Sequence, residues 1–176
     1  MTLPNPTIRL ATSADAQRLS ALAARTFRQT YAAKLDAAEL ELHIAQTFHE
    51  RIQRDELCDP NRCTLLLSGD ACELGYAQLR SVAAPGCMEG AAALELQRFY
   101  LEQQLIGRGM ARPFMDAVKQ AARERGAELL WLCVWERNPR AIAFYEKCGF
   151  ATVGEAGFPF GAAMLRDLVM CCALRS

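Results

Sequence analysis

The sequence predicts a mixed α/β protein whose elements follow the order strand, two helices, three strands, helix, strand, helix, two strands. Short segments that alternate apolar and polar residues, such as Thr7–Ala11, indicate strands. Longer segments with an apolar residue every three or four positions, such as Leu19–Phe27, indicate amphipathic helices. The almost fully apolar run Leu129–Trp135 lies between two helical segments, which is typical of a buried strand in a strand–helix–strand unit.

The first part of the chain carries signals for two helices. Thr12 can cap a helix with Asp15 as its capping-box partner, and the apolar stripe of that helix consists of Leu19, Leu22, Ala23, Thr26 and Phe27. Asp36 together with Glu39 indicates the start of a second helix. The apolar stripe of the second helix consists of Leu40, Ile44, Phe48 and Ile52.

The middle and end of the chain follow the same logic. Two strands are expected on either side of a Gly69–Asp70 turn. Residues Ala92–Leu101 form a third strand candidate, with one side made by Glu95, Gln97, Phe99 and Leu101. A helix that stops near Gly126 carries the stripe Ala111, Phe114, Met115, Val118 and Ala122. Asn138 and Pro139 start a further helix that ends at Gly149, and two strands are expected near 151–154 and 165–174.

Length and composition limit the class of protein. The 176 residues fit a single domain over 1–176, and 20 Lys+Arg balance 20 Asp+Glu, so no excess of positive charge favours nucleic acid as a partner. No apolar window is long enough for a membrane span, and no secretory signal is visible, which predicts a cytoplasmic protein without a membrane partner.

The eight cysteines are then expected to be reduced thiols, and they form no CxxC pair. Neither His43 nor His49 has a cysteine at zinc-finger spacing, so no metal site is expected.

The segment Gln104–Phe114 carries the first chemical signal. Gly107 and Gly109 stand between a strand and a helix, where glycine lets the main chain turn so that successive N–H groups point at one spot. The helix start adds unpaired N–H groups and partial positive charge, which together suit a pyrophosphate, and Arg108 and Arg112 could add side-chain charge. Taken alone, the same pattern is also compatible with a plain turn into a helix.

A dinucleotide-binding fold is the main alternative for this loop. Its fingerprint needs a third Gly or Ala where Arg112 stands, although Glu136 could imitate its ribose-binding acid. A single strand–helix–strand unit after three strands that look antiparallel does not make a doubly wound sheet. The element order therefore argues against this alternative.

Two motifs in combination resemble the GCN5-related N-acetyltransferases (GNAT). Gln104, Gly107 and Gly109 match the first motif of that family, Gln/Arg-x-x-Gly-x-Gly/Ala. The second motif, Asn-x-x-Ala-x-x-Phe-Tyr-x-x-x-Gly-Phe, is matched by Asn138, Ala141, Phe144, Tyr145, Gly149 and Phe150. The resemblance covers nearly the whole chain. It implies a mostly antiparallel sheet of about seven strands with a splayed parallel pair, flanked by four helices.

The resemblance also implies acetyl transfer from acetyl-coenzyme A, without a metal. In the family the pyrophosphate lies on main-chain N–H groups of the first motif, which starts at Gln104; here these groups belong to Leu105, Ile106, Gly107, Arg108, Gly109 and Met110. The pantetheine arm pairs with the preceding strand, here near Phe99, Tyr100 and Leu101. Asn138 is expected to contact the pantetheine or phosphate region, and Tyr145 to lie near the thioester sulfur as general acid.

The chain further resembles the PaiA-like branch of polyamine acetyltransferases. The residues that carry this similarity are Trp131, Trp135, Glu136, Phe158, Gly161, Asp167 and Met170. It makes spermidine or spermine the leading acceptor. Acetylation of a protein N-terminus, or of a small xenobiotic or antibiotic amine, remains an alternative, and so does a non-catalytic sensor that binds coenzyme A. The acceptor and the oligomeric state stay open, and a homodimer through exposed strands is compatible with the fold.

The reaction needs a group that removes a proton from the amine. An alkylammonium has a pKa of about 10.4, so only about one molecule in a thousand is neutral near pH 7.4. Glu95, on the strand before the loop, is the first candidate for the base, and Glu136 is the second. Direct transfer is favoured over an acetyl-cysteine intermediate, because neither Cys133 nor Cys148 has a histidine base nearby in sequence.

Residues 26–48 are expected to wall the acceptor site. The polar side chains available in this region are Tyr31, Asp36, Glu39 and Glu41. Asp36 and Glu39 also have an explanation as helix-start residues, so they are not assigned as ligands.

Overall fold

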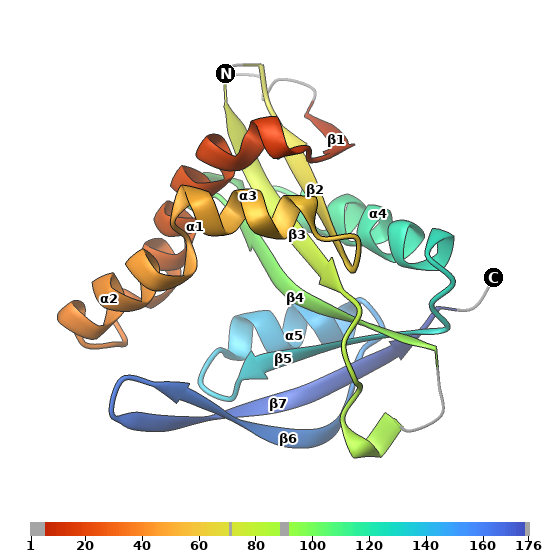
Figure 1. Cartoon of the computed structure of the whole chain (residues 1–176). Coiled ribbons are helices and arrows are strands. Elements are labelled where there is room, and N and C mark those ends of the chain that lie inside the picture. The colour runs from red at the N-terminus through yellow and green to blue at the C-terminus, as the bar shows by residue number, and fades with distance from the viewer. Residues whose placement is uncertain (1–5, 71, 89–91, 175–176) are drawn as a thin grey trace. The chain divides into compact units, whose positions relative to one another are not determined.

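The computed structural model describes residues 6–70, 72–88 and 92–174, apart from the side chain of Cys87, and Figure 1 shows its elements in chain order. The strands are β1 (Thr7–Leu10), β2 (Arg62–Ser68), β3 (Glu73–Arg80), β4 (Ala93–Leu101), β5 (Leu129–Trp135), β6 (Ala151–Phe160) and β7 (Ala163–Ala173). The α-helices are α1 (Ala16–Tyr31), α2 (Ala37–Thr47), α3 (Glu50–Cys58), α4 (Ala111–Glu124) and α5 (Pro139–Lys147). Three short 3₁₀ turns, η1 (Ser13–Asp15), η2 (Gly86–Met88) and η3 (Gln103–Leu105), complete the list.

The strands hydrogen-bond in the order β1-β2-β3-β4-β5-β7-β6, which confirms the predicted mixed sheet of seven strands. β4 and β5 run parallel to each other, whereas β1 with β2, β5 with β7 and β6 with β7 are antiparallel. A parallel neighbour needs a crossover, which here is the segment that contains α4.

The prediction of four helices was wrong by one, because the second helical segment breaks in two. α2 stops at Thr47, and His49 adopts φ −57° and ψ 142°, which is outside the helical region. The Nδ1 atom of His49 then accepts a hydrogen bond from the N–H of Arg51 at 3.2 Å, so His49 caps a new helix. Periodicity alone did not reveal this break, since the apolar spacing continues across it.

The described residues group into two compact units. Unit 1 comprises 1–78 and 98–114, and unit 2 comprises 79–97 and 115–176. β3, β4 and α4 contribute residues to both units. The assignment of 1–176 to a single domain stays a prediction.

In unit 1 the apolar face of α1 forms the centre of the core. The predicted stripe is confirmed, because the side chains of Leu19, Leu22, Ala23, Thr26 and Phe27 are all buried. α3 lies against α1 and across β2 (Figure 1). β2 contributes the buried residues Leu65, Leu66 and Leu67 to the same core.

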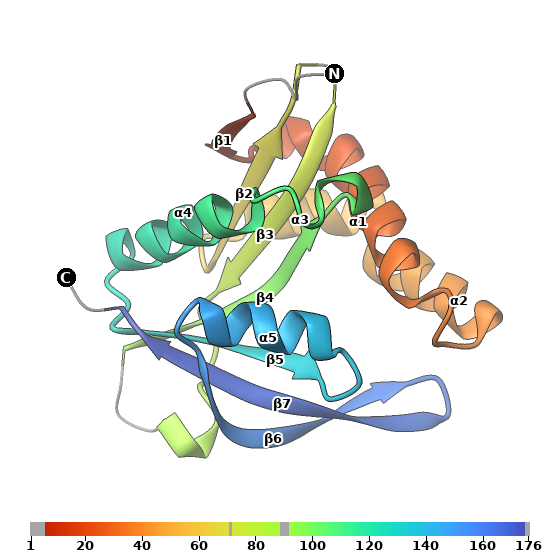
Figure 2. The same ribbon diagram turned by 180° about the vertical axis from the view of Figure 1, so that it is seen from behind.

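In unit 2, α5 lies over β5 and β7, and β6 and β7 form a long hairpin (Figure 2). The α4 stripe is confirmed by the complete burial of Met115, Val118 and Ala122. The ammonium group of Lys119 donates a hydrogen bond to the carbonyl oxygen of Cys148 and lies 5.2 Å from the centre of the Phe150 ring. Lys119 therefore fixes the C-terminal end of α5 against α4.

The predicted helix starts are confirmed by cap geometry. Thr12 opens η1 and α1 through a capping box with Asp15. Asp36 accepts hydrogen bonds from the N–H groups of Ala38 and Glu39 at 3.0 and 3.1 Å. Asn138 caps α5, with Pro139 at its first position. Glycines with positive φ follow α4 and α5 at Gly126 and Gly149, where the sequence predicts the ends of these helices.

Within the described ranges, no helix has both the length and the apolar character that crossing a membrane requires. All cysteines whose side chains are described are free thiols: Cys58, Cys63, Cys72, Cys133, Cys148, Cys171 and Cys172.

Asp15 leads to a prediction about acid stability. Its carboxylate accepts two hydrogen bonds from the Arg9 guanidinium at 2.8 Å and one from the Thr12 N–H at 2.8 Å, and the contacts with Arg9 hold the pKa of Asp15 well below its usual range despite burial. A carboxylate with a lowered folded-state pKa stabilises the protein above its unfolded pKa of about 4, and this contribution is lost as the pH falls through the folded value. Asp15→Asn should therefore lower the unfolding free energy by about 1–3 kcal/mol near pH 7, and the difference should shrink below about pH 4.

Urea unfolding at several pH values measures this difference. Glu155→Gln, which removes an exposed ion pair with Arg166, is the control and should have a much smaller effect at neutral pH. A loss for Asp15→Asn that stays constant down to pH 2 would contradict the assigned charge effect.

Candidate functional site

The segment between β4 and α4 forms a tight main-chain turn. After η3 the chain is extended at Ile106, and then Gly107 and Gly109 adopt φ values of 78° and 79°. Residues with a Cβ atom adopt this left-handed conformation at a cost of about 1–2 kcal/mol each, which explains the two glycines. No atom lies within 4 Å of a Cβ placed at either glycine, so the backbone angle and not space requires them.

The N–H groups of this turn divide into two sets. The N–H groups of Leu105, Ile106 and Arg108 donate to the carbonyls of Glu102, Gln103 and Leu105, at 2.9, 3.1 and 3.1 Å. The N–H groups of Gly107, Gly109 and Met110 have no hydrogen-bond partner among the described residues. Both glycines are exposed, and α4 begins at the next residue, Ala111. Of the six N–H groups expected to hold a phosphate, three are therefore available for an anion.

The side chains of this loop also divide into two sets, one buried and one exposed. Leu105 is buried and anchors the turn, whereas Gln104 and Arg108 are exposed. Arg108 can add positive charge next to the available N–H groups. A helix start with exposed N–H groups and a nearby guanidinium is well suited to bind a phosphate group.

The strand before the loop extends beyond its parallel partner. The pairing of β4 with β5 covers Ala93–Glu95 and Leu129–Trp131, although β4 continues to Leu101. In this continuation, the Phe99 ring packs on Phe114 at 5.3 Å and the Tyr100 ring stacks on Tyr76 at 5.6 Å. The main chain of Phe99, Tyr100 and Leu101 is thus held by rings on its own unit.

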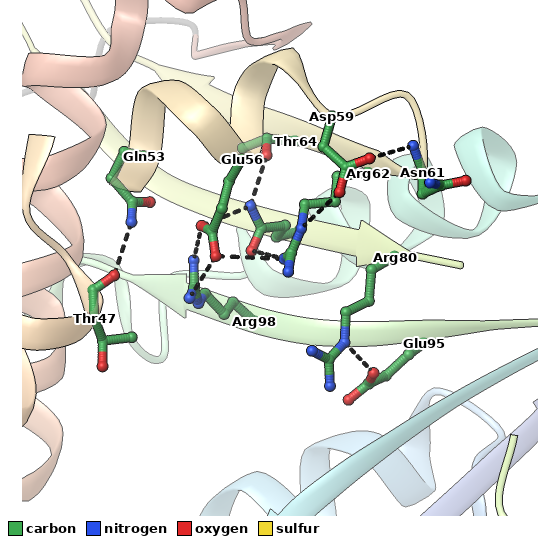
Figure 3. Close-up of polar contacts among 11 residues, drawn as sticks. Thr47, Gln53, Glu56, Asp59, Asn61, Arg62, Thr64, Arg80, Glu95 and Arg98 are labelled. Atoms are coloured by element: carbon green, nitrogen blue, oxygen red, sulfur yellow. Dashed lines mark hydrogen bonds and ion pairs between the residues drawn. The ribbon is translucent and has the colours of Figure 1, made fainter. Parts of the chain in front are cut away.

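Glu95 is a buried carboxylate with one cationic neighbour. It is only 5% exposed, and its Oε2 atom accepts a hydrogen bond from Nε of Arg80 on β3 (Figure 3). Glu95 was predicted from the sequence, whereas its partner Arg80 was not. The sequence feature that could have predicted this pair is Arg80 at the end of an otherwise buried strand, with the acidic Glu95 on the following strand.

Arg98 on β4 forms a second buried ion pair, within unit 1. Its guanidinium donates to Glu56 of α3 at 2.5 and 3.2 Å (Figure 3). The same guanidinium lies 5.2 Å from the centre of the Phe48 ring. Gln78 donates to the same carboxylate and to Thr64, both at 3.3 Å. Strict alternation along β4 fails, since Glu95, Leu96 and Arg98 are all buried. The sequence analysis missed this network because Glu56 and Arg98 are 42 positions apart.

In unit 2, α5 carries the two residues of the second motif that were expected to act in the reaction. Asn138 is nearly buried, and its Oδ1 atom accepts a hydrogen bond from the N–H of Ala141 at 3.4 Å. Tyr145 is 9% exposed, and its ring packs on Phe144 at 5.5 Å and on Phe150 at 5.7 Å. The ring of Tyr145 is therefore held in place on both sides.

The other candidate groups of unit 2 have different environments. Burial, together with the charges of Asp167 and Glu95, raises the pKa of the Cys133 thiol to about 11. A thiol with this pKa is protonated near neutral pH, so Cys133 is a poor nucleophile there. Burial also raises the pKa of Asp167. Glu136 is less buried than Glu95 and pairs with Arg166 at 3.2 Å.

The region expected to wall the acceptor site contains a group of aromatic rings in unit 1. The Phe27 ring lies 4.6 Å from Tyr31, 5.0 Å from His43 and 5.3 Å from Phe48. Burial and the Arg98 charge lower the pKa of His43. Of the acidic residues there, Asp36 caps α2 and Glu41 pairs with Arg28. The structure therefore assigns local roles to both acids.

No cluster of three or more His, Cys, Asp or Glu side chains with metal-binding arrangement occurs in the described part of the chain.

Comparisons with known proteins identify the family. The family model described as the acetyltransferase (GNAT) family matches residues 21–150. An uncharacterised N-acetyltransferase of Mycobacterium tuberculosis is 31% identical over 156 residues, which cover 89% of this chain and 96% of that protein. The spermine/spermidine N(1)-acetyltransferase of Bacillus subtilis is 26% identical over 141 residues, covering 75% of this chain and 91% of the relative.

The structure of the PaiA N-acetyltransferase of Thermoplasma acidophilum in complex with coenzyme A is also similar. Its TM-score is 0.79 at 19% sequence identity, and the match covers 96% of this chain and 99% of that chain. This likeness confirms the predicted fold. On the fold, the two motifs and the match of the family model, the chain belongs to the GNAT family of N-acetyltransferases.

Proposed function

We propose that this N-acetyltransferase moves the acetyl group of acetyl-coenzyme A directly to a primary amine, and that the leading acceptor is a polyamine such as spermidine or spermine. The observation that carries the proposal is that the N–H groups of Gly107, Gly109 and Met110, directly before α4, have no hydrogen-bond partner within the described part of the chain. Such a set binds an anion with fixed geometry, and the donor carries a pyrophosphate. The similar structure that contains coenzyme A supports this choice of donor.

The pantetheine arm is assigned to the β4 continuation. Its amide groups can hydrogen-bond to the main chain of Phe99, Tyr100 and Leu101, as an additional strand would. The absence of β5 pairing beyond Glu95 supports this assignment. Gln104 begins the loop and Asn138 contributes its remaining amide hydrogens to the donor. The Oδ1 atom of Asn138 already accepts a bond from Ala141, so the amide orientation is fixed.

Glu95 acts as general base and Tyr145 as general acid. The amine loses a proton to the Glu95 carboxylate, directly or through water, and its nitrogen forms a bond with the thioester carbon. When the C–S bond breaks, the electron pair stays on sulfur, and the thiolate takes a proton from the Tyr145 hydroxyl. The nitrogen gives up its second proton, directly or through water, to the Tyr145 phenolate, and Glu95 releases its proton to solvent, so that the amide and the free thiol leave and both side chains regain their starting state. A phenol of pKa about 10 gives a proton to a thiolate of pKa about 8.5 at a cost of about 2 kcal/mol, so Tyr145 mainly orients the sulfur. The raised pKa of Cys133 supports direct transfer without an acetyl-cysteine intermediate.

A polyamine is the leading acceptor for two reasons. The branch-specific residues include Asp167, a half-buried carboxyl on β7 that can attract a cationic substrate, whereas the charge of Glu95 in the same unit is already paired with Arg80. The Bacillus relative is named as a spermine/spermidine acetyltransferase. A protein N-terminus or a xenobiotic amine would be the acceptor instead if polyamines fail, and a coenzyme A sensor would bind the donor without turnover.

The experiment that tests the proposal measures coenzyme A release with a panel of amines, together with coenzyme A binding by calorimetry. Spermidine and spermine should give the highest kcat/KM. Gly109→Ala should weaken coenzyme A binding about 10-fold, because alanine at φ 79° is strained by about 1–2 kcal/mol and reorients the loop. Wild-type protein that binds no coenzyme A would refute the proposal, and binding without turnover on any amine would favour the sensor.

Glu95→Gln should lower kcat about 100-fold or more, since the amide cannot accept the amine proton. The coenzyme A dissociation constant should change little. Glu136→Gln is the matched control, because Glu136 was the second candidate for the base. Wild-type turnover of Glu95→Gln at every pH, or a greater loss in Glu136→Gln, would show that the base is assigned incorrectly.

Tyr145→Phe should lower kcat about 10- to 1000-fold without abolishing it, because a thiolate also leaves without help. Steady-state kinetics at saturating acetyl-coenzyme A measure this effect. The thermal midpoint should stay near the wild-type value, since the ring contacts with Phe144 and Phe150 remain. An unchanged kcat would leave Tyr145 with a packing role only.

A further inference from the structure

Glu102 directly follows the last residue of β4 and precedes η3, which leads into the glycine turn. It is only 7% exposed, and its N–H donates to the carbonyl oxygen of Leu74 on β3 at 2.8 Å. Its own carbonyl accepts the N–H of Leu105 at 2.9 Å. The main-chain N–H group of Glu102 is therefore bonded to β3, and its carbonyl group is bonded to η3, which leads into the loop.

The side chain of Glu102 binds helix α1 at two points. Its Oε1 atom accepts a hydrogen bond from Nε of Arg25 at 2.5 Å, and its Oε2 atom accepts one from Nε2 of Gln29 at 3.0 Å. Arg25 and Gln29 are four positions apart on α1, so they present their side chains on one face of the helix. The buried carboxylate is thus paired with a charge and an amide at once.

Gln29 makes a second contact that reaches the loop itself. Its Oε1 atom accepts the N–H of Gln103 at 3.1 Å, and the carbonyl of Gln103 in turn accepts the N–H of Ile106. One exposed glutamine therefore connects to both residues that start the turn. All these contacts lie within unit 1, which also contains Gly107, Gly109 and Met110.

A purely structural purpose would not require this arrangement. A buried ion pair is often no more stabilising than apolar residues of similar volume, because both charges lose their hydration. Hydrogen-bonded side chains, in contrast, fix the orientation of the groups they bind, because a hydrogen bond requires a particular geometry. Anion binding by main-chain N–H groups depends on such orientation, and small displacements weaken it.

We propose that Glu102 and Gln29, supported by Arg25, are positioning residues that hold the loop in the form that binds the pyrophosphate of coenzyme A. This inference rests on the proposed function. It makes α1 part of the support of the donor site, in addition to its place in the region expected to wall the acceptor. The consequence is a specific defect in donor affinity when the contacts are removed, with little change in the chemical step.

The test compares wild-type protein with Gln29→Met and Glu102→Gln. Gln29→Met removes both bonds of an exposed side chain, so folding is not at risk, and Glu102→Gln removes the charge while keeping the shape. Both should raise the coenzyme A dissociation constant and the KM for acetyl-coenzyme A about 5- to 10-fold. The kcat at saturating donor should stay within about 2-fold of the wild-type value.

Arg28→Met is the matched control. Arg28 lies on the same helix and pairs with Glu41 at 2.6 Å, but this pair is exposed, and among the described residues Arg28 makes no hydrogen bond or ion pair with the loop segment. Its coenzyme A dissociation constant should equal that of the wild type. Thermal unfolding of all variants separates affinity from stability.

The outcomes discriminate between the two proposals. Variants that unfold at lower temperature but bind coenzyme A as the wild type does would overturn this inference and leave the proposed function intact. A loss in kcat without a loss in donor affinity would also overturn it. Wild-type protein without any affinity for coenzyme A would overturn the proposed function and this inference with it.

Discussion

The functional interpretation depends on one main-chain constraint, the pair of left-handed residues before α4. Because Gly107 and Gly109 adopt φ values near 78°, the chain presents the N–H groups of Gly107, Gly109 and Met110 without partners at a helix start. Main-chain donors cannot rotate independently, so their usefulness depends on whatever holds the turn. Leu105 holds it through burial, and the contacts of Glu102 with α1 hold its beginning.

Charged residues on β4 show a second principle, the pairing of every buried charge. Glu95 has Arg80 as its partner, and Arg98 has Glu56. Pairing limits the cost of removing a charge from water, although it does not make the pair more stabilising than an apolar contact. The benefit is a fixed carboxylate or guanidinium in a defined place. If Glu95 is the general base, as we propose, the ammonium group of the acceptor meets a carboxylate that already has the Arg80 guanidinium beside it.

Each unit, taken by itself, contains side chains whose chemistry suits part of an amine acceptor. Unit 1 offers aromatic rings around Phe27, where burial and then the charge of Arg98 lower the pKa of His43. Unit 2 offers the carboxyl groups of Asp167 and Glu95, whose charges add to the effect of burial in raising the pKa of Cys133. The first environment suits apolar or aromatic parts of an acceptor, and the second suits a cationic part.

The sequence by itself determined the elements that rest on local chemistry. Caps at Thr12, Asp36 and Asn138, the stripes of α1 and α4, and the glycine turn were all predicted, because each depends on residues within one or two helical turns. The glycine turn was predicted from its place between a strand and a helix, whereas Tyr145 was selected through the resemblance to the second family motif. Only the tertiary structure revealed the break before His49, the partner Arg80 for Glu95, the Arg98–Glu56 pair and the Gln29–Glu102 contact. These contacts join residues up to 73 positions apart, and periodicity carries no information on which distant strand or helix supplies a partner.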